Sequence, residues 1–273
     1  MSQSRELQLH ITQMEEIRTI LNSMKNLAFM EIHKLMRFQA MQGQAVANIE
    51  NAAMDFLHFY PCLPDADDNA TQVCILVGAE RGFCGDFNES LINAISGVAY
   101  SGVIAIGSRL CNKLEDNPLE VISASEGANV SEEVPAVINR LIDTINSLQK
   151  TDSFLTLTVV YHDNVLNQIT QRQILPPFPE QKSGIFRHGN PPVLNLEPAY
   201  FFSSLVDHYL FAILHEIFYI SLMAENHRRL QHLEGAVKHL DDETVNLRRK
   251  SQIYRQEEIT EEIEVILLNT ENM

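Results

Sequence analysis

The stretch MEEIRTILNSMKNLAFMEIHKLMRF, residues 14–38, decides the fold of this chain. It contains neither glycine nor proline, and apolar residues recur in it every seven positions. That row is Met14, Leu21, Ala28 and Leu35. A second, mostly apolar row follows the first three residues later: Ile17, Met24, Glu31 and Phe38. Spacings that alternate between three and four residues are typical of the seam of a coiled coil.

The distribution of glycine and proline extends this helix and predicts a second one. Residues 1–60 and residues 200–273 each contain one glycine and no proline. All ten prolines lie between Pro61 and Pro198. Inside a helix, glycine costs about 1 kcal/mol and proline about 3 kcal/mol. We therefore predict three segments: an N-terminal coiled-coil helix (1–60), a globular α/β domain (61–198) and a C-terminal coiled-coil helix (199–273).

The C-terminal helix repeats the seven-residue pattern with Leu233, Leu240 and Leu247. Both helices join the central domain at their inner ends, so they must run antiparallel if they pair. The C-terminal helix is longer, and we expect its last turns to extend unpaired past the N-terminus. The apolar residues there would need a cover from another protein. They are Ile259, Ile263, Val265, Ile266, Leu267 and Leu268.

The central segment alternates between short apolar runs and amphipathic stretches. We expect strands at residues 72–78, 103–106, 120–123, 154–161 and 168–175. Helices are expected between them at 88–100, 109–115 and 132–149. This order predicts a Rossmann-like domain with a mostly parallel sheet and helices on both faces. The predicted fold class is thus α/β plus a long antiparallel coiled coil.

Composition excludes several function classes. The chain has 273 residues, 45% of them apolar, and a net charge of −16, which disfavours disorder and nucleic-acid binding. Its apolar runs are too short for direct membrane insertion. The segment 61–197 has 8 basic and 17 acidic residues, which suits a protein held near a membrane by partner subunits. Four cysteines without paired spacing indicate reduced thiols in the cytoplasm.

The turn that follows the first strand offers two alternatives. Gly78, Gly82 and Gly85 are loosely spaced like a phosphate-binding loop, but Asp86 and Phe87 stand where such a loop has lysine and a hydroxyl residue. A carboxylate there favours a structural turn. Cys84 lies at the start of a predicted helix, so it is either an activated nucleophile or, more simply, a small buried thiol.

Two other patterns have plain interpretations. The histidine pairs of the C-terminal helix are seven residues apart, whereas helical metal ligands are usually three or four apart. They are His208 with His215 and His232 with His239. We therefore predict no metal site at these histidines, and we identify no cofactor-binding or catalytic residue in the sequence. A basic stretch around 248–255 is followed by an acidic one at 257–264, which is either a solvated helix face or a docking surface.

Three motifs resemble the gamma subunit of F-type ATP synthases. Residues 80–88, ERGFCGDFN, resemble that family's D-R-G-L-C-G-G-F-N signature. Residues 20–28, ILNSMKNLA, resemble its I-T-x-A-M-K-M-V-A stretch, and residues 255–262, RQEEITEE, resemble its R-Q-x-x-I-T-x-E stretch. The motifs occur in family order at family spacing. Asp86 in place of glycine and Asn26 in place of methionine indicate a divergent branch, alternate or sodium-linked.

The resemblance implies a non-catalytic rotor subunit of the central stalk. It would transmit torque between the membrane ion-translocating ring and a catalytic ring of alpha and beta subunits, in a hetero-oligomer on the cytoplasmic face of the membrane. It implies that Arg255, Gln256 and Thr260 contact loops of the alpha/beta ring, and that Met24 and Lys25 lie near an acidic loop of beta. The globular domain would meet the epsilon subunit and the c-ring. The coupling ion would be a proton or sodium.

Two rival functions remain open at this stage. One is a coiled-coil scaffold of another assembly with an α/β docking domain. The other is a small-ligand or nucleotide-binding α/β enzyme with helical arms, which would depend on the Gly82–Gly85 turn.

Overall fold

The computed structural model describes residues 3–61, 71–115, 117–151, 155–164, 166, 168–178 and 190–271. It divides into two compact units: residues 1–28 with 230–273 form one, and residues 29–229 form the other. We describe each unit by itself. The predicted division at 60/61 and 198/199 stays a proposal about domains, and these units have other boundaries.

Two helices supply the first unit and part of the second. Helix α1 spans Gln3–Phe59 and helix α5 spans Pro198–Glu271. Proline at the start of α5 is favourable, because the first turn of a helix leaves its N–H groups without intrahelical partners. The ends of both helices lie close to the predicted limits.

In the first unit the two helices pair antiparallel. Arg18 of α1 pairs with Asp241 of α5, with Nε 2.5 Å from Oδ1. Three residues earlier on α1, Glu15 pairs with Arg248, which lies seven residues later on α5. Numbers that rise along α1 therefore fall along α5. The seam buries Leu21, Leu233 and Leu247, each at most 7% exposed. This confirms the seven-residue row that contains Leu21, whereas Ile17 and Phe38 of the second predicted row are 48% and 37% exposed.

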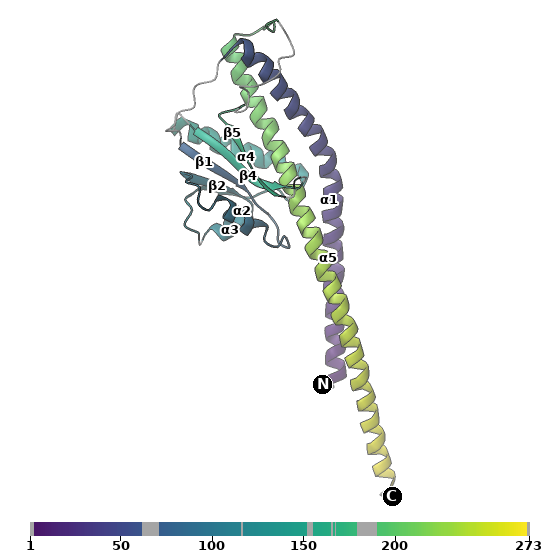
Figure 1. Cartoon of the computed structure of the whole chain (residues 1–273). Coiled ribbons are helices and arrows are strands. Elements are labelled where there is room, and N and C mark those ends of the chain that lie inside the picture. Colours follow the sequence, from purple (N-terminus) through teal and green to yellow (C-terminus); the bar gives the residue numbers. More distant parts are fainter. Residues whose placement is uncertain are drawn as a thin grey trace. The chain divides into compact units, whose positions relative to one another are not determined.

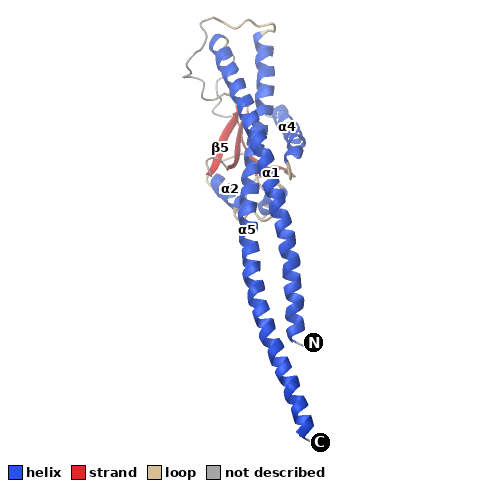
Figure 2. Ribbon diagram, turned by 90° about the vertical axis from the view of Figure 1, so that its right-hand side faces the viewer, coloured by secondary structure: helices blue, strands red, loops and turns tan. Residues whose placement is uncertain are grey.

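Among the described residues of this unit, no second helix runs beside the last turns of α5 (Figure 2). Figure 2 shows its last turns continuing past the N-terminal end of α1. The described apolar residues of the expected tail are about half exposed, from 47% to 63%. They are Ile259, Ile263, Val265, Ile266 and Leu267. The side chain of Leu268 lies outside the described residues.

The second unit contains a five-stranded sheet (Figure 1). In chain order the strands are β1 Thr71–Val77, β2 Gly102–Ile106, β3 Val121–Ser125, β4 Leu155–Asp163 and β5 Gln168–Leu175. Their spatial order is β3-β2-β1-β4-β5, and β5 alone is antiparallel to its neighbour. Its antiparallel pairing follows from a connection too short for a crossover helix. The predicted mostly parallel sheet is confirmed.

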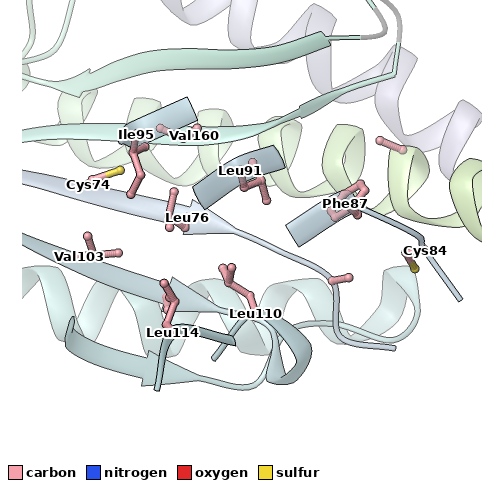
Figure 3. Close-up of a cluster of buried hydrophobic side chains, with 13 residues drawn as sticks. Cys74, Leu76, Cys84, Phe87, Leu91, Ile95, Val103, Leu110, Leu114 and Val160 are labelled. Atoms are coloured by element: carbon pink, nitrogen blue, oxygen red, sulfur yellow. The ribbon is translucent and has the colours of Figure 1, made fainter. Parts of the chain in front are cut away.

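Helices cover both faces of this sheet. In chain order they are α2 Phe87–Ile95, α3 Ser108–Leu114, the 3₁₀ turn Ser131–Glu133 and α4 Val134–Thr151. Figure 2 shows α2 and α4 on opposite sides of the strands. Figure 3 shows one core, in which α2 and α3 pack on alternate residues of β1 and β2. Among its members, Leu91 and Leu110 are fully buried.

The helix predicted to run to residue 100 ends earlier, at Ile95. The following Gly97 has φ +100°, which an α-helix excludes, and it turns the chain back toward β2. The first residue of the strand predicted at 154–161 lies outside the described residues.

The most apolar 18-residue window of α5 has a mean hydropathy of 1.3, enough by length and composition for a membrane span. However, 61% of that window is buried inside the protein, so packing accounts for its apolar character. No other helix of the described residues passes the same test.

Leu21 and the adjacent Ile20 have side chains of similar size, so substitutions at these two positions can test the assigned seam. Leu21 is 7% exposed and Ile20 is 60% exposed. We expect Leu21→Asp to lower the free energy of unfolding by about 2–5 kcal/mol, because it buries an unpaired charge. Ile20→Asp, the matched control, should change it by less than about 0.5 kcal/mol. Circular dichroism during thermal unfolding measures both, and equal effects would contradict the assigned seam.

Candidate functional site

The turn after β1 is built by close packing rather than around an open cradle. A Cβ on Gly78 would lie 2.5 Å from the Cβ of Leu110 and 2.8 Å from Oδ1 of Asn88. That Asn88 oxygen accepts a hydrogen bond from the N–H of Ala79 at 2.9 Å. Phe83 and Gly85 follow with positive φ angles of 64° and 61°, which bend the loop into α2. Glycine at position 78 therefore serves side-chain packing.

The carboxylate of Glu80 ties this turn to two neighbouring segments. It accepts hydrogen bonds from the Ser108 N–H at 2.8 Å, the Ser108 hydroxyl at 2.7 Å and the Gly127 N–H at 2.7 Å. Burial raises the pKa of Glu80, but these bonds outweigh it, and the pKa lies below its ordinary value. Glu80 is therefore an ionised structural brace at the start of α3.

A second carboxylate stands where a phosphate would bind. Glu225 of α5 is 4% exposed and accepts the backbone N–H groups of Glu80 and Arg81, both at 3.4 Å. In open α/β sheets, ligands bind outside the carboxyl ends of the strands where the strand order reverses, which here is between β1 and β4. The protein's own helix fills this place, and the phosphate-cradle alternative is wrong.

Arg229 completes the attachment of α5 to the turn. Its guanidinium pairs with Glu225 and donates to Oδ1 of Asn226 at 2.9 Å and to the carbonyl of Gly82 at 3.3 Å. Eight residues before Arg229 along α5, the Ser221 hydroxyl donates to the carbonyl of Val77 at 3.3 Å. We call Ser221, Glu225 and Arg229 the α5 clamp.

Cys84 belongs to the same packing. It is 6% exposed, and burial raises the pKa of its thiol to about 12, with the carboxylate of Glu225 acting in the same direction. A thiol of that pKa stays protonated at neutral pH, so the nucleophile alternative is wrong and the buried-thiol interpretation holds.

The residues implied as partner contacts all lie in the first unit. Met24 and Lys25 are half-buried on α1, whereas Arg255, Gln256 and Thr260 are exposed on α5. The Thr260 hydroxyl donates to the carbonyl of Gln256 at 2.8 Å, so it leans back along its own helix.

The histidines of α5 do not form a metal centre in the described part of the chain, where no group of three or more histidine, cysteine, aspartate or glutamate residues is placed to hold an ion. His215 is buried and hydrogen-bonded through Nδ1 to the carbonyl of Phe211 at 2.8 Å, and burial lowers its pKa. Its partner in spacing, His208, is exposed.

The sequence pattern did not lead us to predict the α5 clamp. Its signal was present, because Glu225 and Arg229 are four residues apart inside an otherwise apolar part of the C-terminal helix. An ion pair at that spacing on a buried face must be compensated by hydrogen bonds from elsewhere in the fold. Which turn supplies them is a long-range fact that spacing does not reveal.

Comparison with known proteins gives a consistent result. The family model described as ATP synthase matches residues 3–271. ATP synthase gamma chains of Clostridium botulinum, from strains Langeland and Hall, are each 26% identical over 212 residues. These alignments cover 74% of this chain and 73% of each relative.

Solved structures share the fold. A chain of the Euglena gracilis mitochondrial ATP synthase (OSCP/F1/c-ring) is 13% identical with a TM-score of 0.68, covering 99% of this chain and 94% of its own. A chain of the Tetrahymena thermophila mitochondrial ATP synthase central stalk and c-ring is 14% identical with a TM-score of 0.55, covering 80% and 99%. At these identities the likeness concerns architecture.

The α5 clamp gives a stability prediction with a pH dependence. Arg229→Met leaves the buried Glu225 uncompensated and should lower the free energy of unfolding by about 3–5 kcal/mol at neutral pH. Burial already raises the pKa of Glu225, with Arg229 opposing it, and the substitution raises it further. A raised carboxyl pKa favours the folded state at low pH, so the loss should shrink as pH falls toward the ordinary pKa.

Denaturant unfolding at several pH values measures this loss. The control is Glu225→Leu with Arg229→Met, which removes both charges and should recover much of the stability. A loss that is independent of pH, and is not recovered by the double variant, would contradict the assignment.

Proposed function

Because the chain belongs to the ATP synthase family, in the branch of its gamma chains, we propose that it transmits torque as the central-stalk subunit of a rotary F-type ATP synthase. The subunit would link the membrane ion-translocating ring to the catalytic ring of alpha and beta subunits. The observation that carries the proposal is the antiparallel pairing of α1 and α5, with the last turns of α5 left without a helical partner.

The pairing supplies what a rotating shaft requires. Continuous helices resist twisting, because every turn is closed by backbone hydrogen bonds. A shaft also needs surfaces that differ around its axis, since a partner shifts a conformational equilibrium only through contacts that differ between states. The half-exposed apolar residues 259–267 are then covered by the inner surface of the alpha/beta ring.

The partner contacts are assigned as follows. Arg255, Gln256 and Thr260 bind loops of the alpha/beta ring, and their exposure on α5 supports this role. Met24 and Lys25 lie near an acidic loop of beta, and an ammonium group suits that charge. The epsilon subunit and the c-ring bind the globular domain. The similar Euglena gracilis chain comes from an assembly of OSCP, F1 and c-ring, and the Tetrahymena thermophila chain from a central stalk with its c-ring.

The subunit is non-catalytic in this proposal, and the complex around it carries out ATP synthesis or hydrolysis. Its coupling ion is a proton or sodium, selected in the membrane ring outside this chain. The complex sits on the cytoplasmic face of the cell membrane, with this subunit peripheral to it. The acidic composition of segment 61–197 agrees with attachment through partners rather than through anionic lipid.

Assembly is the direct test. The chain is produced together with the alpha and beta subunits encoded in the same genome, and complexes are purified through a tag on beta. We expect a stable complex that contains this chain and hydrolyses ATP. Absence of the chain from the complex, or full activity without it, would reject the rotor and favour a coiled-coil scaffold of another assembly.

Arg255 and Gln256 provide the mutational test. Replacing both with alanine should lower the ATPase activity of the assembled complex, because contacts with the alpha/beta ring are lost. Both side chains are exposed, so stability of the chain should change by less than about 0.5 kcal/mol. Lys238→Ala, at another exposed cation of α5, is the control and should preserve activity. A large drop in melting temperature with normal turnover would show that the pair is structural.

A further inference from the structure

We propose that Arg172 of β5 is a torque link that fastens the sheet to both long helices at once. Its guanidinium reaches Glu50 of α1, with Nη2 2.9 Å from Oε1, and Glu216 of α5, with Nη1 3.0 Å from Oε2. We call these three residues the Arg172 junction. The inference rests on the proposed function, since a torque link has meaning only in a rotor.

The junction lies where the two helices approach closely within the second unit. A Cβ on Gly43 of α1 would lie 3.2 Å from Oε1 of Glu216. In the preceding position of α1, the Gln42 amide donates to the carbonyl of Ala212 on α5 at 2.9 Å. The two carboxylates are therefore held by helices that are themselves in contact, and one guanidinium bridges them.

The surroundings favour a strong interaction. Side-chain exposure is 31% for Arg172, 35% for Glu50 and 17% for Glu216, so water screens the pairs only in part. Tyr161 and Tyr209 flank the guanidinium, and burial raises the pKa of Tyr161 to about 12. The hydroxyl is thus neutral at working pH, while the guanidinium stays charged. Burial raises the pKa of Glu216, and the neighbouring Arg172 opposes this shift.

The geometry suits the transfer of torque. Packed helices yield to load by sliding a small distance past each other, and apolar contacts resist this weakly because they have no direction. A planar guanidinium that bonds two carboxylates in fixed geometry does have direction. Sliding of α1 along α5, or of either helix along the sheet, must break one of its two ion pairs.

Two other groups of polar contacts in the described part of this unit attach α1 and α5 separately. Glu31 of α1 accepts the N–H of Ser131 at 2.6 Å, and Lys34 reaches Glu132 at 2.8 Å. The α5 clamp joins α5 alone to the turn after β1. Arg172 differs because it connects three elements through one side chain.

The test uses the assembled complex in sealed vesicles and compares ATP hydrolysis with ATP-driven uptake of the coupling ion. We expect Arg172→Gln to assemble and hydrolyse ATP near the wild-type rate, while ion uptake per ATP falls about threefold or more. Arg172→Lys keeps the charge but loses the fork that binds both carboxylates, so its coupling should be intermediate. Lys113→Gln removes an exposed pair with Glu89 inside the sheet domain and should couple normally.

A third variant separates mechanics from stability. Arg172→Gln combined with Glu50→Gln and Glu216→Gln removes the uncompensated charges as well as the ion pairs. We expect it to recover thermal stability and assembly but to remain poorly coupled, whether or not Arg172→Gln itself assembles. A merely structural residue would show coupling restored together with stability.

The outcomes also separate this inference from the proposed function. If the wild-type chain neither assembles nor couples, the rotor itself is rejected. If the wild-type chain couples and the triple variant couples equally well, the rotor stands and the torque link is overturned. If all Arg172 variants lose coupling in the expected order, both are supported.

Discussion

The attachment of α5 to the carboxyl end of the sheet is the constraint on which the second unit depends. Glu225 and Arg229 are 4% and 5% exposed, and two buried charges are stable only if their remaining hydrogen-bonding groups are satisfied. The turn after β1 satisfies them with two N–H groups and a carbonyl. Helix α5 and the turn therefore fix each other's position through these contacts.

This attachment gives the Rossmann-like sheet of this chain a structural role. The crevice at the reversal of strand order is the usual ligand site of such sheets. In this chain Glu225 of α5 accepts hydrogen bonds from the backbone N–H groups of the turn. Gly78 packs closely against Leu110 and Asn88. A site that holds a ligand in other proteins has become a joint that holds a helix.

A rotor subunit needs such joints because it acts mechanically on other subunits. Glu31 joins α1 to the 3₁₀ turn Ser131–Glu133, and the clamp joins α5 to β1 and the turn after it. The Arg172 junction joins the sheet to both helices. The links are directional polar contacts set among apolar ones, which hold register under load. The exposed end of α5, in contrast, is left for partners to cover.

The sequence by itself determined the two terminal helices, their seam, the alternating central domain and the family resemblance. These follow from local rules: the absence of helix breakers, a seven-residue period such as Leu233, Leu240 and Leu247, and strands of apolar residues. Local spacing also placed Asp86 where a phosphate-binding loop has lysine, which argued against that alternative.

Tertiary structure decided what the turn and the charged residues do. Arg172 and Glu50 are 122 residues apart, and Arg81 and Glu225 are 144 apart. No periodicity relates such pairs, because their contact is set by how α1 and α5 pack against the sheet, and that packing is a property of the whole core.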